Sequence, residues 1–171
     1  MLIIASVIYV KVYLCRDTSV ENSRYIVYSH TQQVMFKVTG KHKSGFERMY
    51  INTPQDDCVA KITDTSIAML RTCHVSSKYG NFHFVVSHTK DRMTITYHGL
   101  PFHIRGNIAE KSYDILDVDN SIIACVQKRF KTSSETLELN INDDKYLVHC
   151  IASAVCLNLG STCDVLQLQT T

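Results

Sequence analysis

The stretch that decides the fold is Tyr146-Leu147-Val148-His149-Cys150-Ile151-Ala152-Ser153-Ala154-Val155-Cys156-Leu157-Asn158-Leu159. Asp143 and Asp144 precede it as candidate N-caps and Gly160 follows it as a C-terminal stop, so we predict one helix over about residues 144–159. The quoted stretch of about fourteen residues would rise about 21 Å as a helix, which is too short for a bilayer. Its apolar residues occupy every side, and a helix that is hydrophobic all round must be buried all round.

The rest of the sequence predicts β-structure. Up to about residue 141 it repeats short runs of β-branched and aromatic residues closed by Gly, Asn, Asp or Ser, separated by turns of hairpin length. We predict about twelve strands over residues 7–141. Their expected bounds are Val7–Leu14, Arg24–His30, Gln33–Thr39, Glu47–Asn52, Cys58–Thr63, Ile67–Val75, Phe82–His88, Arg92–His98, Phe102–Gly106, Ser112–Asp117, Ser121–Arg129 and Glu135–Ile141.

The need to bury the helix relates the predicted helix to the predicted strands. In a chain of this size only the sheet can surround the helix, and about twelve antiparallel strands can close into a barrel wide enough to hold one. We therefore predict a mainly β fold, a closed antiparallel barrel around a central hydrophobic C-terminal helix. Ala152, Ser153 and Ala154 would let the sheet approach closely. The alternative is a β-sandwich with the helix laid across one end.

Composition limits the class of protein. The 171 residues suit a single domain, and 45% hydrophobic content with a net charge of +2 excludes a disordered chain. The nearly balanced charge gives no reason to expect nucleic-acid binding. The seven cysteines are odd in number and scattered, which indicates reduced thiols and a cytoplasmic protein, with a peripheral position at a membrane as the further expectation. For the apolar N-terminus we favour a first strand over a signal or an anchor.

Short motifs resemble a known family. Phe36-Lys37-Val38-Thr39-Gly40-Lys41, then Phe46-Glu47-Arg48-Met49-Tyr50-Ile51 and Asp57-Cys58-Val59-Ala60-Lys61-Ile62, resemble the hairpin of the LURP-one-related and tubby C-terminal-like proteins. A second, weaker copy of the motif begins at Ile104-Arg105-Gly106. The resemblance covers roughly residues 7–160. It implies a twelve-stranded barrel around one hydrophobic helix, as in the phospholipid scramblase-like barrels.

The resemblance also suggests a ligand class. Tubby proteins bind phosphatidylinositol bisphosphate headgroups through Lys and Arg on the barrel, although their binding motif does not map residue by residue onto this chain. The nearest equivalent here is a basic hairpin with four candidate lipid-binding residues, Lys37, Lys41, Lys43 and Arg48. His42 lies within this hairpin, and Lys128, Arg129 and Lys131 form a second basic cluster. A solvated hairpin tip is the structural alternative.

Catalytic and metal sites lack their signatures. Cys73-His74 and His149-Cys150 are sequence neighbours, so their side chains diverge on a strand or a helix. We find no C-x-x-C pair, phosphate-binding glycine loop or nucleophile elbow in the sequence, and we expect no catalytic residue, metal or cofactor. His83 and His103 are one pair that a sheet could bring together. Two functions stay open: a non-catalytic module that binds anionic phospholipid or a membrane surface, and a scaffold domain that recruits a protein partner.

Overall fold

The computed structural model describes residues 9–17, 19, 23–43, 46–67, 70–89, 92–129 and 135–167. Within these ranges the side chains of 23, 41–43, 46 and 159–167 are not described. The described residues form twelve strands, a 3-10 turn η1 (Asp144–Tyr146) and one helix, α1 (Leu147–Gln167). The strands are β1 (Val10–Arg16), β2 (Ser23–Ser29), β3 (Val34–Lys43), β4 (Phe46–Asn52), β5 (Cys58–Ile67), β6 (Leu70–Ser77), β7 (Phe82–Thr89), β8 (Arg92–His98), β9 (His103–Asn107), β10 (Ser112–Leu116), β11 (Ile122–Arg129) and β12 (Thr136–Ile141).

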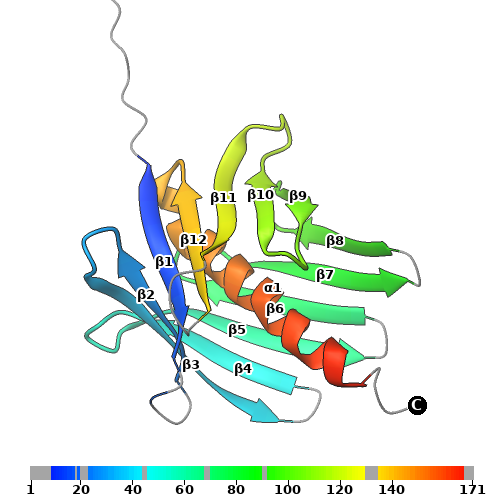
Figure 1. The fold of residues 1–171 in the computed structure, drawn as a ribbon, viewed down its shortest axis with the longest axis horizontal. Helices are drawn as coiled ribbons and strands as arrows, with labels where there is room; N and C mark the ends of the chain where they lie inside the picture. The colour runs from blue at the N-terminus through cyan, green and yellow to red at the C-terminus, as the bar shows by residue number, and fades with distance from the viewer. Residues whose placement is uncertain are drawn as a thin grey trace, which may run out of the picture.

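The strands form one antiparallel sheet that curls into a nearly closed barrel (Figure 1). Their order is β8-β7-β6-β5-β4-β3-β2-β1-β12-β11-β10-β9, so the first and last strands pair at the centre of the sheet. Strands β8 and β9 are the edges; they touch, but no backbone ladder joins them among the described residues. The predicted barrel is confirmed and the sandwich alternative is wrong, because one continuous sheet supplies the whole wall.

The helix lies inside this wall. Residues 148–158 of α1 are all buried, and the small residues Ala152, Ser153 and Ala154 have no exposed surface. His149 packs on Phe82, near the turn between β6 and β7, whereas the Asn158 amide donates to the Tyr25 hydroxyl at 3.0 Å. The helix therefore runs from one end of the barrel to the other. All turns that lead from an odd-numbered strand to the next even-numbered strand lie at the end of the barrel that holds Asn158 and Tyr25. We call this end the exit end.

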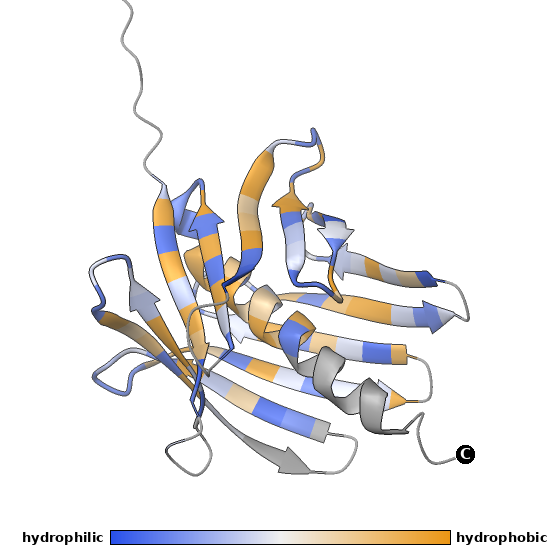
Figure 2. Ribbon diagram, viewed as in Figure 1, coloured by the Kyte–Doolittle hydropathy of each residue, from blue (hydrophilic) through white to orange (hydrophobic). Residues whose placement is uncertain are grey.

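Alternation along the strands builds the core. In Figure 2 hydrophobic residues recur along the strands that surround the helix. Strand β7 shows the pattern, since Phe82, Phe84 and Val86 are buried while His83 and Val85 between them are only partly so. Successive side chains of a strand point to opposite faces, so every second residue reaches the barrel interior and the others form the outer surface.

Two glycines of the family motifs allow strands to approach closely. A Cβ atom on Gly40 would lie 2.8 Å from the backbone oxygen of Arg48 on β4. A Cβ atom on Gly106 would lie 2.6 Å from the backbone oxygen of Ser112, and its φ of +126° also favours glycine. Both copies of the motif thus place a glycine where a neighbouring strand leaves no room for a side chain.

Several predicted boundaries need correction, including the ends of β3 at Lys43 and of β5 at Ile67. The helix does not stop at Gly160 but continues to Gln167, because an interior glycine costs only about 1 kcal/mol and no proline follows it. Its start agrees with the prediction, since the Asp143 carboxylate accepts from the Lys145 backbone N–H. The sixth strand begins at Leu70 rather than Ile67, because Ile67 ends β5 and pairs with Leu70. The first strand begins at Val10, and the predicted residues 7 and 8 lie outside the described part.

We predict that the helix carries much of the stability. Ile151 of α1 is fully buried, so Ile151→Ala should lower the free energy of unfolding by about 2–5 kcal/mol through lost burial and a new cavity. Urea denaturation followed by circular dichroism measures the change. Val118→Ala, at a residue that is 74% exposed, should shift it by less than about 0.5 kcal/mol. Equal small effects at both positions would contradict a helix packed inside the barrel.

Candidate functional site on the outer face of the barrel

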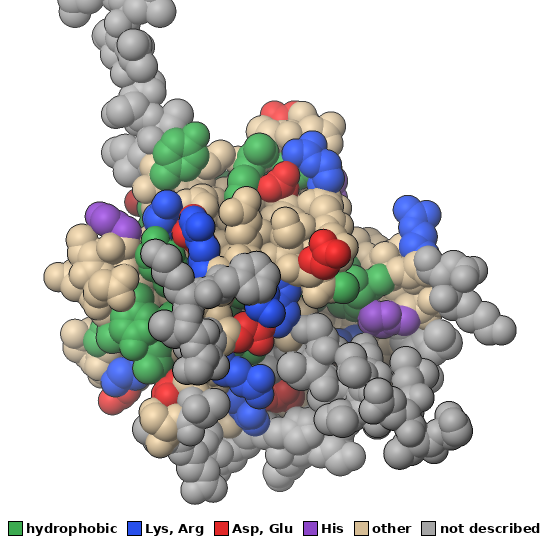
Figure 3. Space-filling model, in the orientation of Figure 1, with side chains coloured by type: hydrophobic (Ala, Val, Ile, Leu, Met, Phe, Trp, Pro, Cys, Tyr) green, Lys and Arg blue, Asp and Glu red, His purple; other side chains and the backbone are tan. Residues whose placement is uncertain are grey.

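Because α1 fills the barrel, the outer surface is the place to look for a site. One groove of about 720 Å³ lies over β1, β2, β11 and β12. Lys11, Tyr13, Cys15, Arg16, Arg129 and Glu138 are among the residues that line it. Figure 3 shows this half of the molecule, where Lys and Arg side chains are interspersed with Asp and Glu.

A buried carboxylate organises the groove. Glu138 points outward from β12, yet its side chain is only 4% exposed. Its oxygens accept from Arg129 Nε at 2.7 Å and from Asn140 Nδ2 at 3.0 Å, and Lys11 Nζ lies 3.5 Å away. Burial opposes ionisation, but the donors from Asn140 and Arg129 and the charge of Lys11 outweigh it, so the pKa of Glu138 lies below its ordinary value. Two of the groove's cations therefore already share this one carboxylate.

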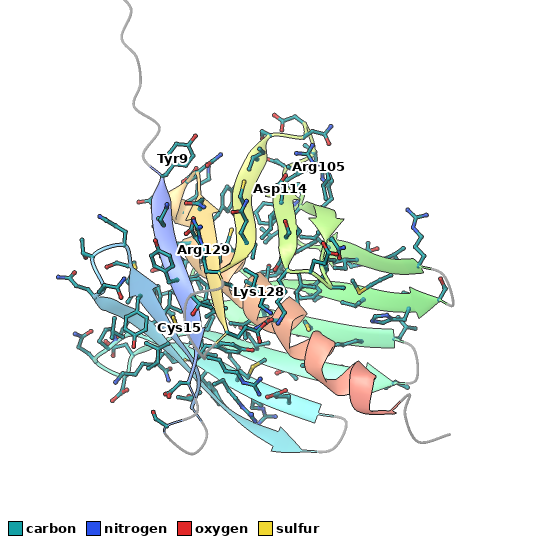
Figure 4. The ribbon with its side chains drawn as sticks, viewed as in Figure 1. Tyr9, Cys15, Arg105, Asp114, Lys128 and Arg129 are labelled. Atoms are coloured by element: carbon teal, nitrogen blue, oxygen red, sulfur yellow. The ribbon has the colours of Figure 1, made fainter. Side chains whose placement is uncertain are left out.

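The neighbouring strands continue this pattern of paired charges. Arg105 on β9 donates to the Asp114 carboxylate on β10 at 3.0 Å, and the two side chains are labelled in Figure 4. Cys125 on β11 lies beside the same carboxylate, and burial together with Asp114 raises the pKa of its thiol to about 11. We call the outer face of β1, β2 and β9–β12 the paired face.

The other half of the barrel differs in charge. The only acidic residues of β3–β8, all described strands, are Glu47 and Asp64, and both share the inner face with buried neighbours. There Glu47 lies 3.4 Å from Arg24, and Asp64 accepts from Arg71. The outward strand positions of β3–β8 thus carry no Asp or Glu. They carry the cations Lys37, Lys41, Lys43, Arg48, Lys61 and Arg92.

We call this surface the acid-free face, and it contains all four predicted lipid-binding residues. Lys41 pairs with Arg48 in the β3–β4 register, and Lys43 follows on the same face toward the exit end. Lys37 pairs with Asn52, roughly 20 Å from Lys43 along the strand. The backbone thus brings three of the four together and separates the fourth. The side chains of Lys41 and Lys43, and that of His42, lie outside the described residues.

Sequence reasoning missed Lys61 on this face. It is exposed on β5, where it pairs with Tyr50 of β4. Arg48 lies two residues before Tyr50, so it is a diagonal neighbour of Lys61 on the same face. The alternation of β5, in which Ile62 and Asp64 are buried, could have placed Lys61 outward. Its nearness to Arg48 depends on strand register, which spacing alone does not reveal.

The second predicted basic cluster is divided by the fold. Arg129 lies in the groove on Glu138, whereas Lys128 shares the opposite face of β11 with the buried Val126 (Figure 4). Lys131 lies outside the described residues. Consecutive strand residues point to opposite faces, so the cluster in sequence is not a cluster in space.

Three histidines form a row on the acid-free face. The His83 ring stacks between His74 of β6, with centroids 5.1 Å apart, and His98 of β8, at 4.7 Å. Burial lowers the pKa of His83, and the two neighbouring rings lower it further. The contact suggested between His83 and His103 is wrong, because register places His83 beside His74 and His98 while His103 bonds Asn120 at 3.1 Å.

Of the two neighbouring Cys–His pairs, the one on a strand is separated as expected. Cys73 is buried and His74 is exposed, on opposite faces of β6. His149 and Cys150 are both buried in α1, and burial raises the pKa of the Cys150 thiol. Cys156 is also buried with a raised pKa, so these thiols are poor nucleophiles.

Both the sequence and the fold of this chain have relatives among known proteins. The family model LURP-one-related matches residues 11–158, and the chain belongs to this family. An X-ray structure of a protein from Arabidopsis thaliana matches with a TM-score of 0.55 at 11% identity, covering 89% of this chain and 93% of that one. At that identity the likeness shows the fold alone. The curated proteins contain no match to this chain. No helix in the described part is both long and apolar enough to cross a bilayer.

Glu138 gives a pH-dependent prediction for stability. Its pKa is lowered on folding, so its contribution is present above its unfolded pKa and is lost as pH falls through the folded value. Glu138→Gln should cost about 1 kcal/mol at pH 7, a figure reduced by solvent screening because Lys11 and Arg129 are partly exposed. Urea denaturation should show the difference closing as pH falls below the ordinary pKa of a glutamate. Asp114→Asn, in an exposed pair, should change stability by less than about 0.5 kcal/mol, and a pH-independent cost at Glu138 would contradict the assignment.

Proposed function

We propose that this chain is a non-catalytic module that binds anionic phospholipid headgroups at a membrane surface through the acid-free face. The observation that carries the proposal is the absence of any carboxylate from the outward strand positions of β3–β8, against six cations there. A surface of one charge sign attracts the opposite sign over about a Debye length. An anionic leaflet offers that sign over a wide area.

The acid-free face suits an anionic surface better than the groove does. In the groove Glu138 already occupies Arg129 and Lys11, so an anionic ligand would have to compete with a buried carboxylate. On the acid-free face no outward position of the β3–β4 and β4–β5 ladders carries a carboxylate. Each Lys or Arg near an anionic leaflet contributes about 1 kcal/mol, so several give weak binding that depends on salt.

The central helix supports a non-catalytic role. Its residues 148–158 are buried against the wall, so they occupy the space in which a barrel of this size would otherwise hold a substrate. The resemblance to tubby-like barrels, whose headgroup sites use surface Lys and Arg, agrees with a site on the outside. The alternative of a protein-binding scaffold would use a free sheet edge such as β8 or β9.

Vesicle co-sedimentation tests the proposal. The protein should bind phosphatidylserine or phosphoinositide vesicles at low salt, bind neutral phosphatidylcholine poorly, and lose affinity as salt rises. Lys41→Glu, Lys43→Glu and Arg48→Glu together should weaken binding by about 100-fold or more, at about 1 kcal/mol per residue.

A charge-matched triple variant provides the control. Lys78→Glu, Arg105→Glu and Lys145→Glu lie outside the acid-free face at exposed positions and lower the net charge from +2 to −4, as the test variant does. It should keep most of the binding. Equal loss of vesicle binding in both variants would mean that only net charge matters. If the protein binds no vesicles at any salt concentration, the protein-binding alternative is favoured instead.

A further inference from the structure

One hairpin at the exit end ends in exposed aliphatic side chains. Ile67 at the end of β5 is 77% exposed and Leu70 at the start of β6 is 52% exposed. The two residues pair directly in the β5–β6 register. Both occupy outward positions on their strands, in line with Lys61 and Thr63 on β5 and with Thr72 and His74 on β6.

This apolar tip lies at the margin of the acid-free face. The β3–β4 and β7–β8 hairpins turn at the same end of the barrel on either side of it, as Figure 1 shows. Lys43 closes β3 on one side, and the exposed Arg92 opens β8 on the other. Aliphatic side chains flanked by cations match the interface of an anionic bilayer, where the cations meet phosphates and the apolar groups reach the acyl region.

We infer that Ile67 and Leu70 insert into the bilayer when the acid-free face meets an anionic membrane, so that the barrel docks with its exit end toward the lipid. This inference rests on the proposed function. A protein partner is a poorer occupant, because two side chains at one hairpin tip offer far less than the roughly 800 Å² per partner that a stable interface buries. Lipid needs no such area, since each apolar group partitions separately.

The sequence offers a direct reporter of insertion, because the chain contains no tryptophan. Ile67→Trp therefore creates a protein with a single indole at the tip. Val118→Trp is its matched control, at a β-branched residue that is 74% exposed in the turn between β10 and β11, at the opposite end of the barrel. On phosphatidylserine vesicles the Ile67→Trp emission should shift to the blue and be quenched by brominated acyl chains. The Val118→Trp emission should not change.

A second variant measures the contribution to affinity. Leu70→Asp should weaken binding to phosphatidylserine vesicles about tenfold, and the part of the binding that survives high salt should fall most. Val118→Asp introduces the same charge at the opposite end and should change the affinity less than threefold. Circular dichroism of each variant confirms that the fold is kept. Pyrophosphate, as a soluble anion, should leave the Ile67→Trp emission unchanged, which separates insertion from binding of a free phosphate.

The outcomes separate this inference from the proposed function. Sedimentation of Ile67→Trp with vesicles and no change in its emission would overturn insertion and leave electrostatic docking in place. A blue shift in Val118→Trp alone would overturn the orientation. Association of wild-type protein without lipid, lost in Leu70→Asp, would assign the tip to a second copy of the chain. If no form of the protein sediments with vesicles, both the inference and the proposed function are wrong.

Discussion

The structure depends on a helix that has no polar side to expose. Residues 148–158 of α1 are buried in every direction, and only a wall that surrounds the helix can achieve this in a chain of 171 residues. The twelve strands supply that wall as one antiparallel sheet, in which β1 pairs with β12 and the edge strands β8 and β9 come into contact. The small residues Ala152, Ser153 and Ala154 keep the filled barrel narrow. Because the helix fills the interior, the binding site that we propose lies on the outer surface.

The outer surface divides into two halves by charge, and strand alternation explains how. Every residue of a strand must face the helix or the solvent, so an acid turned inward is removed from the surface. In β3–β8 both acids, Glu47 and Asp64, are turned inward and are held there by Arg24 and Arg71. On the paired face Glu138 is turned outward and holds Arg129 and Lys11. The same kinds of residue thus produce a face of paired charges and a cationic one.

Much of the fold could be predicted because its signals are local. Turn residues and β-branched runs located twelve strands, and the apolar run from Tyr146 located the helix. The errors arose where one residue had two possible roles: Gly160 stops many helices but is tolerated within this one, and Ile67 ends one strand rather than starting the next. The site was harder to predict because it depends on register. Lys61 beside Arg48, and His83 between His74 and His98, are neighbours only across strands.

Hydrogen exchange measured by mass spectrometry, with and without phosphatidylserine vesicles, tests the account most directly. Amides of residues 148–158 should be among the slowest to exchange and should not respond to vesicles, because they lie in the filled core. Vesicles should slow exchange in the β3–β4 and β5–β6 hairpins and leave β9–β12 unchanged. Fast exchange in the helix, or protection confined to the paired face, would contradict a barrel that is filled within and binds anionic membranes through its acid-free face.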